Sequence, residues 1–150
     1  MLALDCVEST GTIHAFDIDE RALRCLRKTA AREGIKNIVI NAQAVSNADA
    51  TAKLEQISDC GRTRVRENGP GRTVSTITLD TWYGQSQVKN IQAIKMDIEG
   101  GELRALQGAV KMLQAEKPLL VCELLSSHTE HMGYRPEEVT GLLESIGYHT

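Results

Sequence analysis

Short apolar runs alternate with amphipathic stretches along most of the chain, which predicts alternating strands and helices. The run from Thr12 to Phe16 holds β-branched and aromatic residues and predicts a buried strand that follows Gly11. From Glu20 to Arg32 the apolar residues recur at helical spacing, and Gly34 supplies a stop signal. The next strand is predicted from Asn37 to Ala42, so strand, helix and strand follow within the length of a parallel βαβ crossover.

A polar middle section from Ser46 to Thr73 predicts a hairpin-like excursion. The alternation then resumes with a short helix that begins at Asp80 and uses the Asp80 carboxylate as its cap. Strands are predicted over Thr51–Ile57, Arg62–Val65, Val74–Leu79, Ile91–Ile98 and Leu119–Leu125, and helices over Glu102–Leu113 and Pro136–Ile146. This order argues for an open, doubly wound α/β sheet.

Composition places the chain among ordinary soluble globular proteins. It has 150 residues, of which 41% are apolar and 25% charged, and this length fits one domain over residues 1–150. The net charge of −3 gives no general attraction to nucleic acid. No apolar run approaches the roughly 18 residues of a transmembrane helix, and the sequence shows no secretory signal.

The cysteine pattern favours reduced thiols and a cytoplasmic location. Cys6, Cys25, Cys60 and Cys122 are irregularly spaced, and none belongs to a Cys-x-x-Cys pair.

Acidic residues follow three of the predicted strands, where ligands bind in sheets of this kind. Asp17 ends the first strand and can accept hydrogen bonds from ribose hydroxyls, although Asp17 or Asp19 could instead favour the start of the next helix. At the end of the second of these strands, Lys95, Asp97 and Glu99 lie on one side of the strand if it continues as far as Glu99. That pattern fits a reactive site, or only an ion pair followed by a glycine turn.

Glu123 follows the third strand, which looks fully buried, so its carboxylate needs a partner or a raised pKa. His128 and His131 lie just after it and form a weak metal-binding pattern that Asp97, Glu99 and Glu123 could complete. No metal site is predicted on so little, but a metal mechanism stays open.

Five elements together resemble the FkbM family of S-adenosylmethionine-dependent methyltransferases. They are Gly11–Asp17, Asn37–Ile40, Ile77–Asp80, Ile94–Leu103 and Pro118–Glu123, and the most specific is Lys-x-Asp-x-Glu-Gly-x-Glu-Leu within Ile94–Leu103. The resemblance implies a Rossmann-like (class I) methyltransferase fold, S-adenosylmethionine as cofactor, and methylation of a hydroxyl on a sugar, glycan or natural-product acceptor.

The same resemblance implies roles for individual residues. Asp17 would hold the ribose hydroxyls of the methyl donor, and Ala44 would lie near its adenine. Asp97 and Glu99 would face the transferring methyl group and the acceptor, with Glu123 close by. A carboxylate such as Asp97 or Glu99 is then the candidate general base, within about 3 Å of the acceptor hydroxyl.

One departure from the family pattern concerns the start of the chain. Only ten residues precede Gly11, and they contain no glycine, whereas the family places a strand and a glycine-rich loop there. The expectation is therefore a partial domain that lacks the first strand and the donor-binding loop. An exposed strand edge and uncovered apolar surface should follow.

Two further hypotheses compete with an active methyltransferase. An inactive remnant could act as an interaction module that self-associates through its open sheet edge. A nicotinamide-dependent dehydrogenase would share the βαβ unit, but the glycine fingerprint for it is absent.

Overall fold

The computed structural model describes residues 11–56, 63–66 and 69–149, so Cys6, Cys60 and the residues before Gly11 lie outside the described residues. It divides into two compact units, Met1–Ala44 and Val45–Thr150. Each unit is described by itself.

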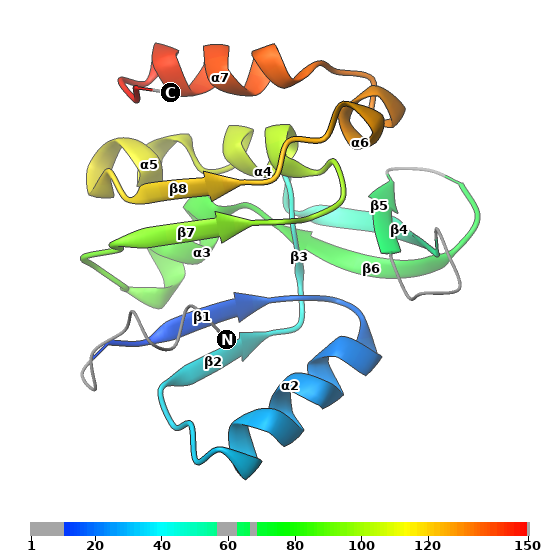
Figure 1. Ribbon diagram of the computed structural model, residues 1–150, viewed down its shortest axis with the longest axis vertical. Helices are drawn as coiled ribbons and strands as arrows, with labels where there is room; N and C mark the ends of the chain where they lie inside the picture. Colours follow the sequence, from blue (N-terminus) through cyan, green and yellow to red (C-terminus); the bar gives the residue numbers. More distant parts are fainter. Residues whose placement is uncertain (1–10, 57–62, 67–68, 150) are drawn as a thin grey trace. The chain divides into compact units, whose positions relative to one another are not determined.

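The first unit is a βαβ crossover (Figure 1). Strands β1 (Ile13–Phe16) and β2 (Ile38–Asn41) pair in parallel, and helix α2 (Glu20–Arg32) connects them. Asp19 caps the helix by accepting a hydrogen bond from the Arg21 amide, and Gly34 follows the helix in the left-handed conformation (φ 68°) that ends it. These boundaries confirm the predicted strand, helix and strand.

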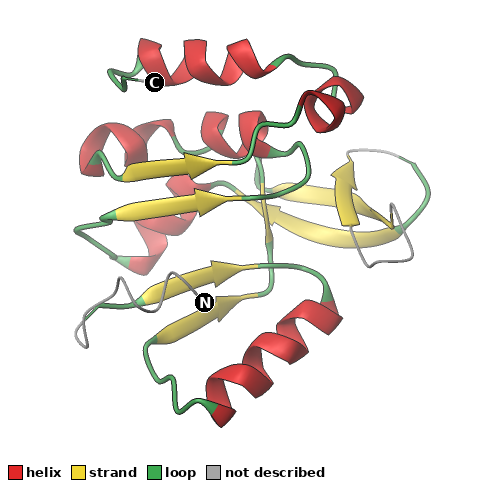
Figure 2. Ribbon diagram, in the orientation of Figure 1, coloured by secondary structure: helices red, strands yellow, loops and turns green. Residues whose placement is uncertain are grey.

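The second unit contains an antiparallel sheet and a parallel strand pair (Figure 2). The antiparallel sheet has the strand order β3 (Ala44–Val45), β6 (Arg72–Ile77), β4 (Ala50–Gln56) and β5 (Thr63–Arg66). The pairing of β4 with β5 confirms the predicted hairpin. The parallel pair is β7 (Ala93–Met96) and β8 (Leu119–Cys122), in which Met96 is the register partner of Cys122.

Helices supply most of the second unit's core. They are α3 (Leu79–Ser86), α4 (Glu102–Gln107), α5 (Val110–Glu116), α6 (Ser126–His131) and α7 (Pro136–Ser145). Their fully buried apolar side chains include Ala105, Leu106, Met112, Leu113 and Val139. Burial of each large side chain stabilises the fold by roughly 1.5–3 kcal/mol.

The α/β class is confirmed, with parallel strand pairs and helices among the described residues. The parallel strands form two separate two-stranded sheets, because β1 pairs only with β2 and β7 only with β8. Each pair therefore has two outer strand edges on which no described strand is hydrogen-bonded.

The prediction of a fully buried strand from Leu119 to Leu125 is wrong. Leu119 is 67% exposed, Val121 52% and Leu125 45%, and Glu123 is exposed as well. The exposed and half-buried positions alternate along β8 because only one of its faces is covered by described residues. Glu123 therefore does not carry the desolvation expected of a buried carboxylate.

Asp80 explains two further differences from the predicted helices. The cap of α3 is Thr78, which accepts from the Thr81 amide, while the Asp80 carboxylate accepts from the amides of Lys111 and Met112 at 3.2 and 2.8 Å. The Asp80 amide also donates to the Gly108 carbonyl. These hydrogen bonds of Asp80 interrupt the predicted helix over Glu102–Leu113, and α5 begins as a separate helix.

Replacement of Asp80 by Ala is expected to lower the free energy of unfolding by roughly 0.5–2 kcal/mol, because α5 loses its capping carboxylate. Urea denaturation followed by circular dichroism measures the change. Glu130→Ala, which removes an exposed carboxylate on α6, is the matched control and should stay within about 0.5 kcal/mol of the native chain. Equal losses in both variants would contradict the capping role.

Candidate functional site

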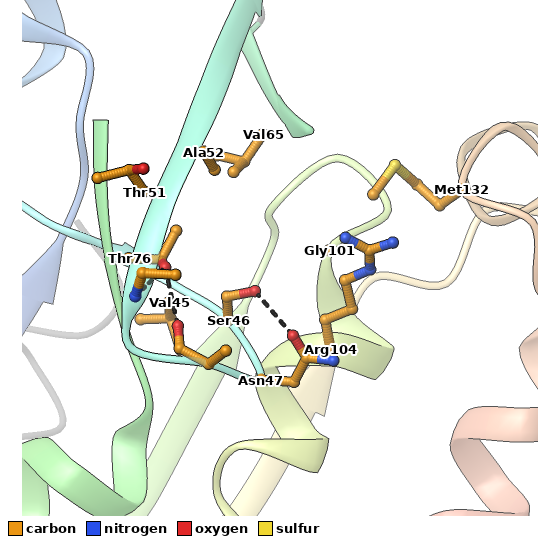
Figure 3. Close-up of a pocket in the computed structure, with 12 residues that line it drawn as sticks. Val45, Ser46, Asn47, Thr51, Ala52, Val65, Thr76, Gly101, Arg104 and Met132 are labelled. Atoms are coloured by element: carbon orange, nitrogen blue, oxygen red, sulfur yellow. Dashed lines mark hydrogen bonds between the residues drawn. The ribbon is translucent and has the colours of Figure 1, made fainter. Parts of the chain in front are cut away.

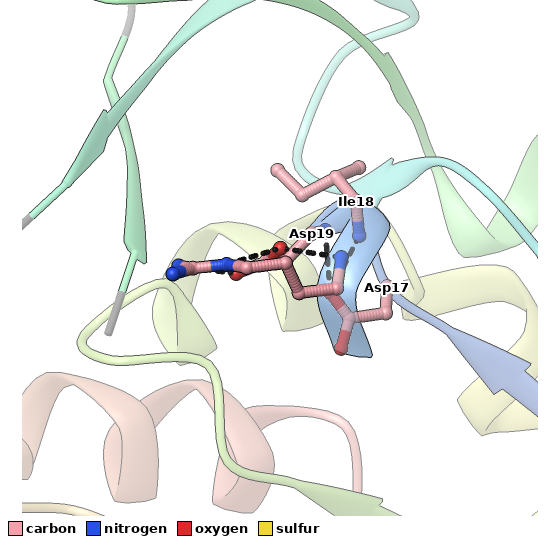
Figure 4. A network of polar contacts seen from close by, with 4 residues as sticks. Asp17, Ile18 and Asp19 are labelled. Carbon is pink, nitrogen blue, oxygen red and sulfur yellow. Dashed lines mark hydrogen bonds and ion pairs between the residues drawn. The ribbon is translucent and has the colours of Figure 1, made fainter. Parts of the chain in front are cut away.

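Asp17 and Asp19 divide two roles at the end of β1 (Figure 4). Oδ1 of Asp17 accepts from the amides of Ile18 and Asp19 at 2.6 and 2.8 Å, which holds the turn after the strand. Asp19 caps α2 and pairs with Arg21, and the Arg21 hydrogen bonds hold the pKa of Asp19 below its usual value. Because Asp19 supplies the helix cap, Asp17 is not needed for it.

The Asp17 side chain is half-buried. Among the described residues, the hydrogen-bond donors to this side chain bind Oδ1, and none binds Oδ2. A carboxylate held by one oxygen and open at the other can accept from a bound hydroxyl. Ala44, the other predicted donor-binding residue, is buried as the first residue of β3.

The carboxyl ends of β7 and β8 bring two predicted site residues together. The Glu123 amide donates to the Met96 carbonyl, so pairing continues one step beyond the strands and sets Asp97 beside Glu123. Lys95 lies 3.0 Å from Asp97 Oδ2, in an ion pair with both side chains largely exposed. The predicted pairing of Lys95 with Asp97 is present.

Lys95 also determines the protonation of Asp97. Its hydrogen bond is the largest influence that lowers the pKa of Asp97, and Glu123 and the charge of His128 lower it further against a smaller effect of burial. Asp97 is therefore an ionised carboxylate at neutral pH and a weak proton acceptor there.

The alternation of side chains assumed that the strand continues to Glu99, but the strand ends at Met96. The chain leaves β7 after Met96, and Glu99 adopts a left-handed φ of 56°, which costs on the order of 1–3 kcal/mol in a residue other than glycine. The turn directs Glu99 to α6, where its Oε2 lies 3.4 Å from His128 Nδ1. We call residues Asp97–Gly101, which follow β7, the β7 loop.

Gly100 lets the β7 loop approach α6 closely. Its φ is 96°, and a Cβ at this position would lie 2.7 Å from the carbonyl oxygen of His128. No other residue type fits this conformation and this contact without displacing backbone.

A buried carboxylate and a buried hydroxyl fix the other side of the β7 loop. Glu102 is 1% exposed, and its Oε1 accepts from the Ile98 amide at 2.9 Å. The Tyr134 hydroxyl donates to the Gly100 carbonyl at 3.0 Å and lies 3.3 Å from Glu102 Oε2. Burial, and then the charge of Glu102, raise the pKa of Tyr134 to about 12, so this hydroxyl keeps its proton at neutral pH.

The sequence pattern indicates neither Tyr134 nor the contact of His128 with Glu99. Tyr134 lies 32 positions from Glu102, and no local pattern connects the two. The predicted helix start at Glu102 likewise gave no sign of its bond to the Ile98 amide. The available signal was the Gly100–Gly101 pair, which marks a point where the backbone needs room.

A small pocket of about 180 Å³ opens beside the β7 loop (Figure 3). Gly101 from the loop and Met132, which follows α6, line it together with Arg104. Thr76 on β6 closes part of another wall and is hydrogen-bonded to the Ala48 carbonyl. The pocket is lined by backbone and by short side chains, with one cation at its edge.

The histidine pair does not converge on a common point. His131 Nδ1 lies 2.7 Å from the Ser127 carbonyl, whereas His128 Nδ1 faces Glu99. Among residues 11–56, 63–66 and 69–149, no group of three or more His, Cys, Asp or Glu side chains could hold a metal ion.

Comparison with known proteins identifies the family. Residues 8–150 match the family described as the methyltransferase FkbM domain, and the chain belongs to that family. In a structural comparison, the chain is similar to methyltransferase FkbM from Methylobacillus flagellatus KT, with a TM-score of 0.56 and 19% identity. The match covers 90% of this chain and 29% of that one, so the chain spans less than a third of its length. No curated protein sequence matches the chain.

The described residues are thus similar in fold to an FkbM methyltransferase, and the family match confirms the resemblance drawn from the five sequence elements. Within the described part of the chain, no helix has the length and apolar character needed to cross a membrane.

Replacement of Tyr134 by Phe is expected to lower the free energy of unfolding by roughly 1–3 kcal/mol, because the buried Glu102 carboxylate and the Gly100 carbonyl lose a partner. Chemical denaturation measures this loss. Tyr148→Phe is the matched control, since its hydroxyl lies 3.5 Å from the nearest acceptor, the Leu113 carbonyl, and contributes little. A Tyr134→Phe chain as stable as the control would show that the hydroxyl does not hold the loop.

Proposed function

We propose that the protein is an S-adenosylmethionine-dependent methyltransferase that methylates a hydroxyl oxygen of a sugar, glycan or natural-product acceptor. The observation that carries the proposal is membership of the FkbM methyltransferase family over nearly the whole chain. The side chains at the end of β7 and β8 support it, because they place proton acceptors and hydrogen-bond acceptors at one edge of a parallel strand pair.

Asp17 and Ala44 are the proposed contacts to the methyl donor. The fit rests on Asp17. Its Oδ1 accepts hydrogen bonds from two backbone amides, and no hydrogen bond from the described residues reaches its Oδ2. Ala44 has no polar side-chain atom and is buried at the start of β3. When bound, S-adenosylmethionine supplies a methyl group on a sulfonium, so no protein acid is needed for the leaving group.

The protein's remaining task is to position the acceptor and receive its proton. In this proposal the ionised Asp97 accepts a hydrogen bond from the acceptor, and Glu123 beside it contacts the acceptor as well. The pocket next to Gly101 is the proposed place for the rest of the acceptor. An exposed Lys95 keeps Asp97 ionised without entering the reaction.

The proposed fold is an incomplete Rossmann-like methyltransferase sheet, in which residues 1–150 act as one domain. The two parallel strand pairs, whose outer edges are not paired with any other described strand, support this. The free thiols of Cys25 and Cys122 support a cytoplasmic location.

Calorimetric titration with S-adenosylhomocysteine tests the donor site. Asp17→Ala is expected to weaken binding about 10- to 100-fold, since a hydrogen bond to a charged group contributes roughly 1.5–3 kcal/mol. Asp97→Asn is the matched control and should change the dissociation constant less than about twofold, because Asp97 serves the acceptor.

Equal losses in the two variants would refute the separate roles of Asp17 and Asp97. Absence of binding by the folded native chain would refute the donor site itself.

A second candidate function is a non-catalytic interaction module that self-associates. The exposed apolar side chains of β8, Leu119 and Val121, favour this candidate. A chain that binds no donor but sediments as a dimer would support it over the methyltransferase.

A further inference from the structure

We propose that His128, oriented by Glu99, is the catalytic base that takes the proton from the acceptor hydroxyl. The inference rests on the proposed methyltransferase function and names a base that differs from the carboxylates suggested by the sequence. Its starting point is the pair itself, in which His128 Nδ1 lies 3.4 Å from Glu99 Oε2. Both side chains are mostly buried, with 17% and 20% exposed.

The backbone is built to hold this pair. Glu99 is in a left-handed conformation, and the next residue, Gly100, lies against the carbonyl oxygen of His128 with no room for a Cβ. On its other side, the Gly100 carbonyl accepts from the buried Tyr134 hydroxyl. The close contact of Gly100 with the His128 carbonyl oxygen thus fixes Glu99, the residue before Gly100, relative to His128.

The geometry selects one nitrogen for the reaction. A neutral imidazole whose Nδ1 proton faces a carboxylate has Nε2 as its proton acceptor. A separation of 3.4 Å is longer than an optimal hydrogen bond, as is common in catalytic pairs before the substrate binds. Glu99 then acts as a positioning residue that fixes the tautomer and stabilises the imidazolium as it forms.

Charged groups lie on several sides of His128. Asp97 is close enough for the charge of His128 to lower its pKa, and Glu123 adjoins Asp97. On the same helix, His131 is engaged with the Ser127 carbonyl. Lys95 is paired with Asp97, while Glu102 faces Tyr134 and the Ile98 amide on the other side of the loop.

Asp97 is a poorer base than His128 for the same step. Its ion pair with Lys95 keeps it ionised and lowers its affinity for a proton. Histidine is the side chain that changes charge between about pH 5 and 8, so it matches the operating pH. Met132, which lies four residues after His128 in the chain, lines the pocket proposed for the acceptor.

The step balances without a further reactant. The acceptor oxygen loses its proton to His128 Nε2 as it bonds to the methyl carbon, and the electron pair of the broken carbon–sulfur bond stays on the donor's sulfur. The sulfonium becomes a neutral thioether, the acceptor becomes a methyl ether, and the imidazolium releases its proton to water.

The experiment combines nitrogen NMR, which identifies the protonated nitrogen of the His128 ring, with a measurement of the rate of methyl transfer. The native chain, His128→Gln, Glu99→Gln and the control His131→Gln are incubated with methyl-labelled S-adenosylmethionine and methyl glycosides of glucose, galactose, mannose and rhamnose. We expect His128→Gln to lower kcat by about 10²–10⁴-fold with unchanged S-adenosylhomocysteine affinity, and His131→Gln to match the native chain.

Glu99→Gln should move the acidic limb of the pH–rate profile to lower pH, because the imidazolium loses its counter-charge. NMR should show the neutral His128 ring protonated at Nδ1 in the native chain. Either the Nε2-protonated tautomer or a His128→Gln chain with native kcat overturns the role of His128 alone. A native chain that binds no donor or methylates no glycoside contradicts the proposed function, and the role of His128 with it.

Discussion

The buried carboxylate of Glu102 is the constraint on which the site around β7 depends. A carboxylate that is 1% exposed must be matched by donors, and it finds them in the Ile98 amide and the neighbouring Tyr134 hydroxyl. Those contacts fix the β7 loop between the strand and α4. The loop in turn sets the positions of Asp97 and Glu99, so the buried Glu102 determines where two proposed site residues lie.

The acidic residues at strand ends and helix starts separate into structural residues and proposed site residues on the same physical basis. Asp19 and Asp80 each satisfy backbone amides at the start of a helix and are accounted for by capping. Asp17 holds its own turn with one oxygen only. Asp97 and Glu99 face the side chains of Lys95 and His128, respectively.

Much of the fold could be predicted from the sequence because its signals are local. The helical period and the Gly34 stop give α2 its exact bounds, and the apolar runs locate β1, β2, β7 and β8. The break between α4 and α5 could not be predicted, because it depends on Asp80, about 30 residues earlier in the chain. The exposure of β8 depends on which strands and faces are covered, and that is a tertiary property.

The same distinction holds for the candidate site. Asp17, Asp97 and Glu123 follow apolar runs and were found from that pattern, whereas the Glu99–His128 pair depends on a left-handed turn that brings residues 29 positions apart together. Amide hydrogen exchange at Ile98 tests most directly whether Glu102 holds the loop. We predict slow exchange in the native chain and fast exchange in Glu102→Ala, with little change at amides of α2. Fast exchange at Ile98 in the native chain would contradict the account.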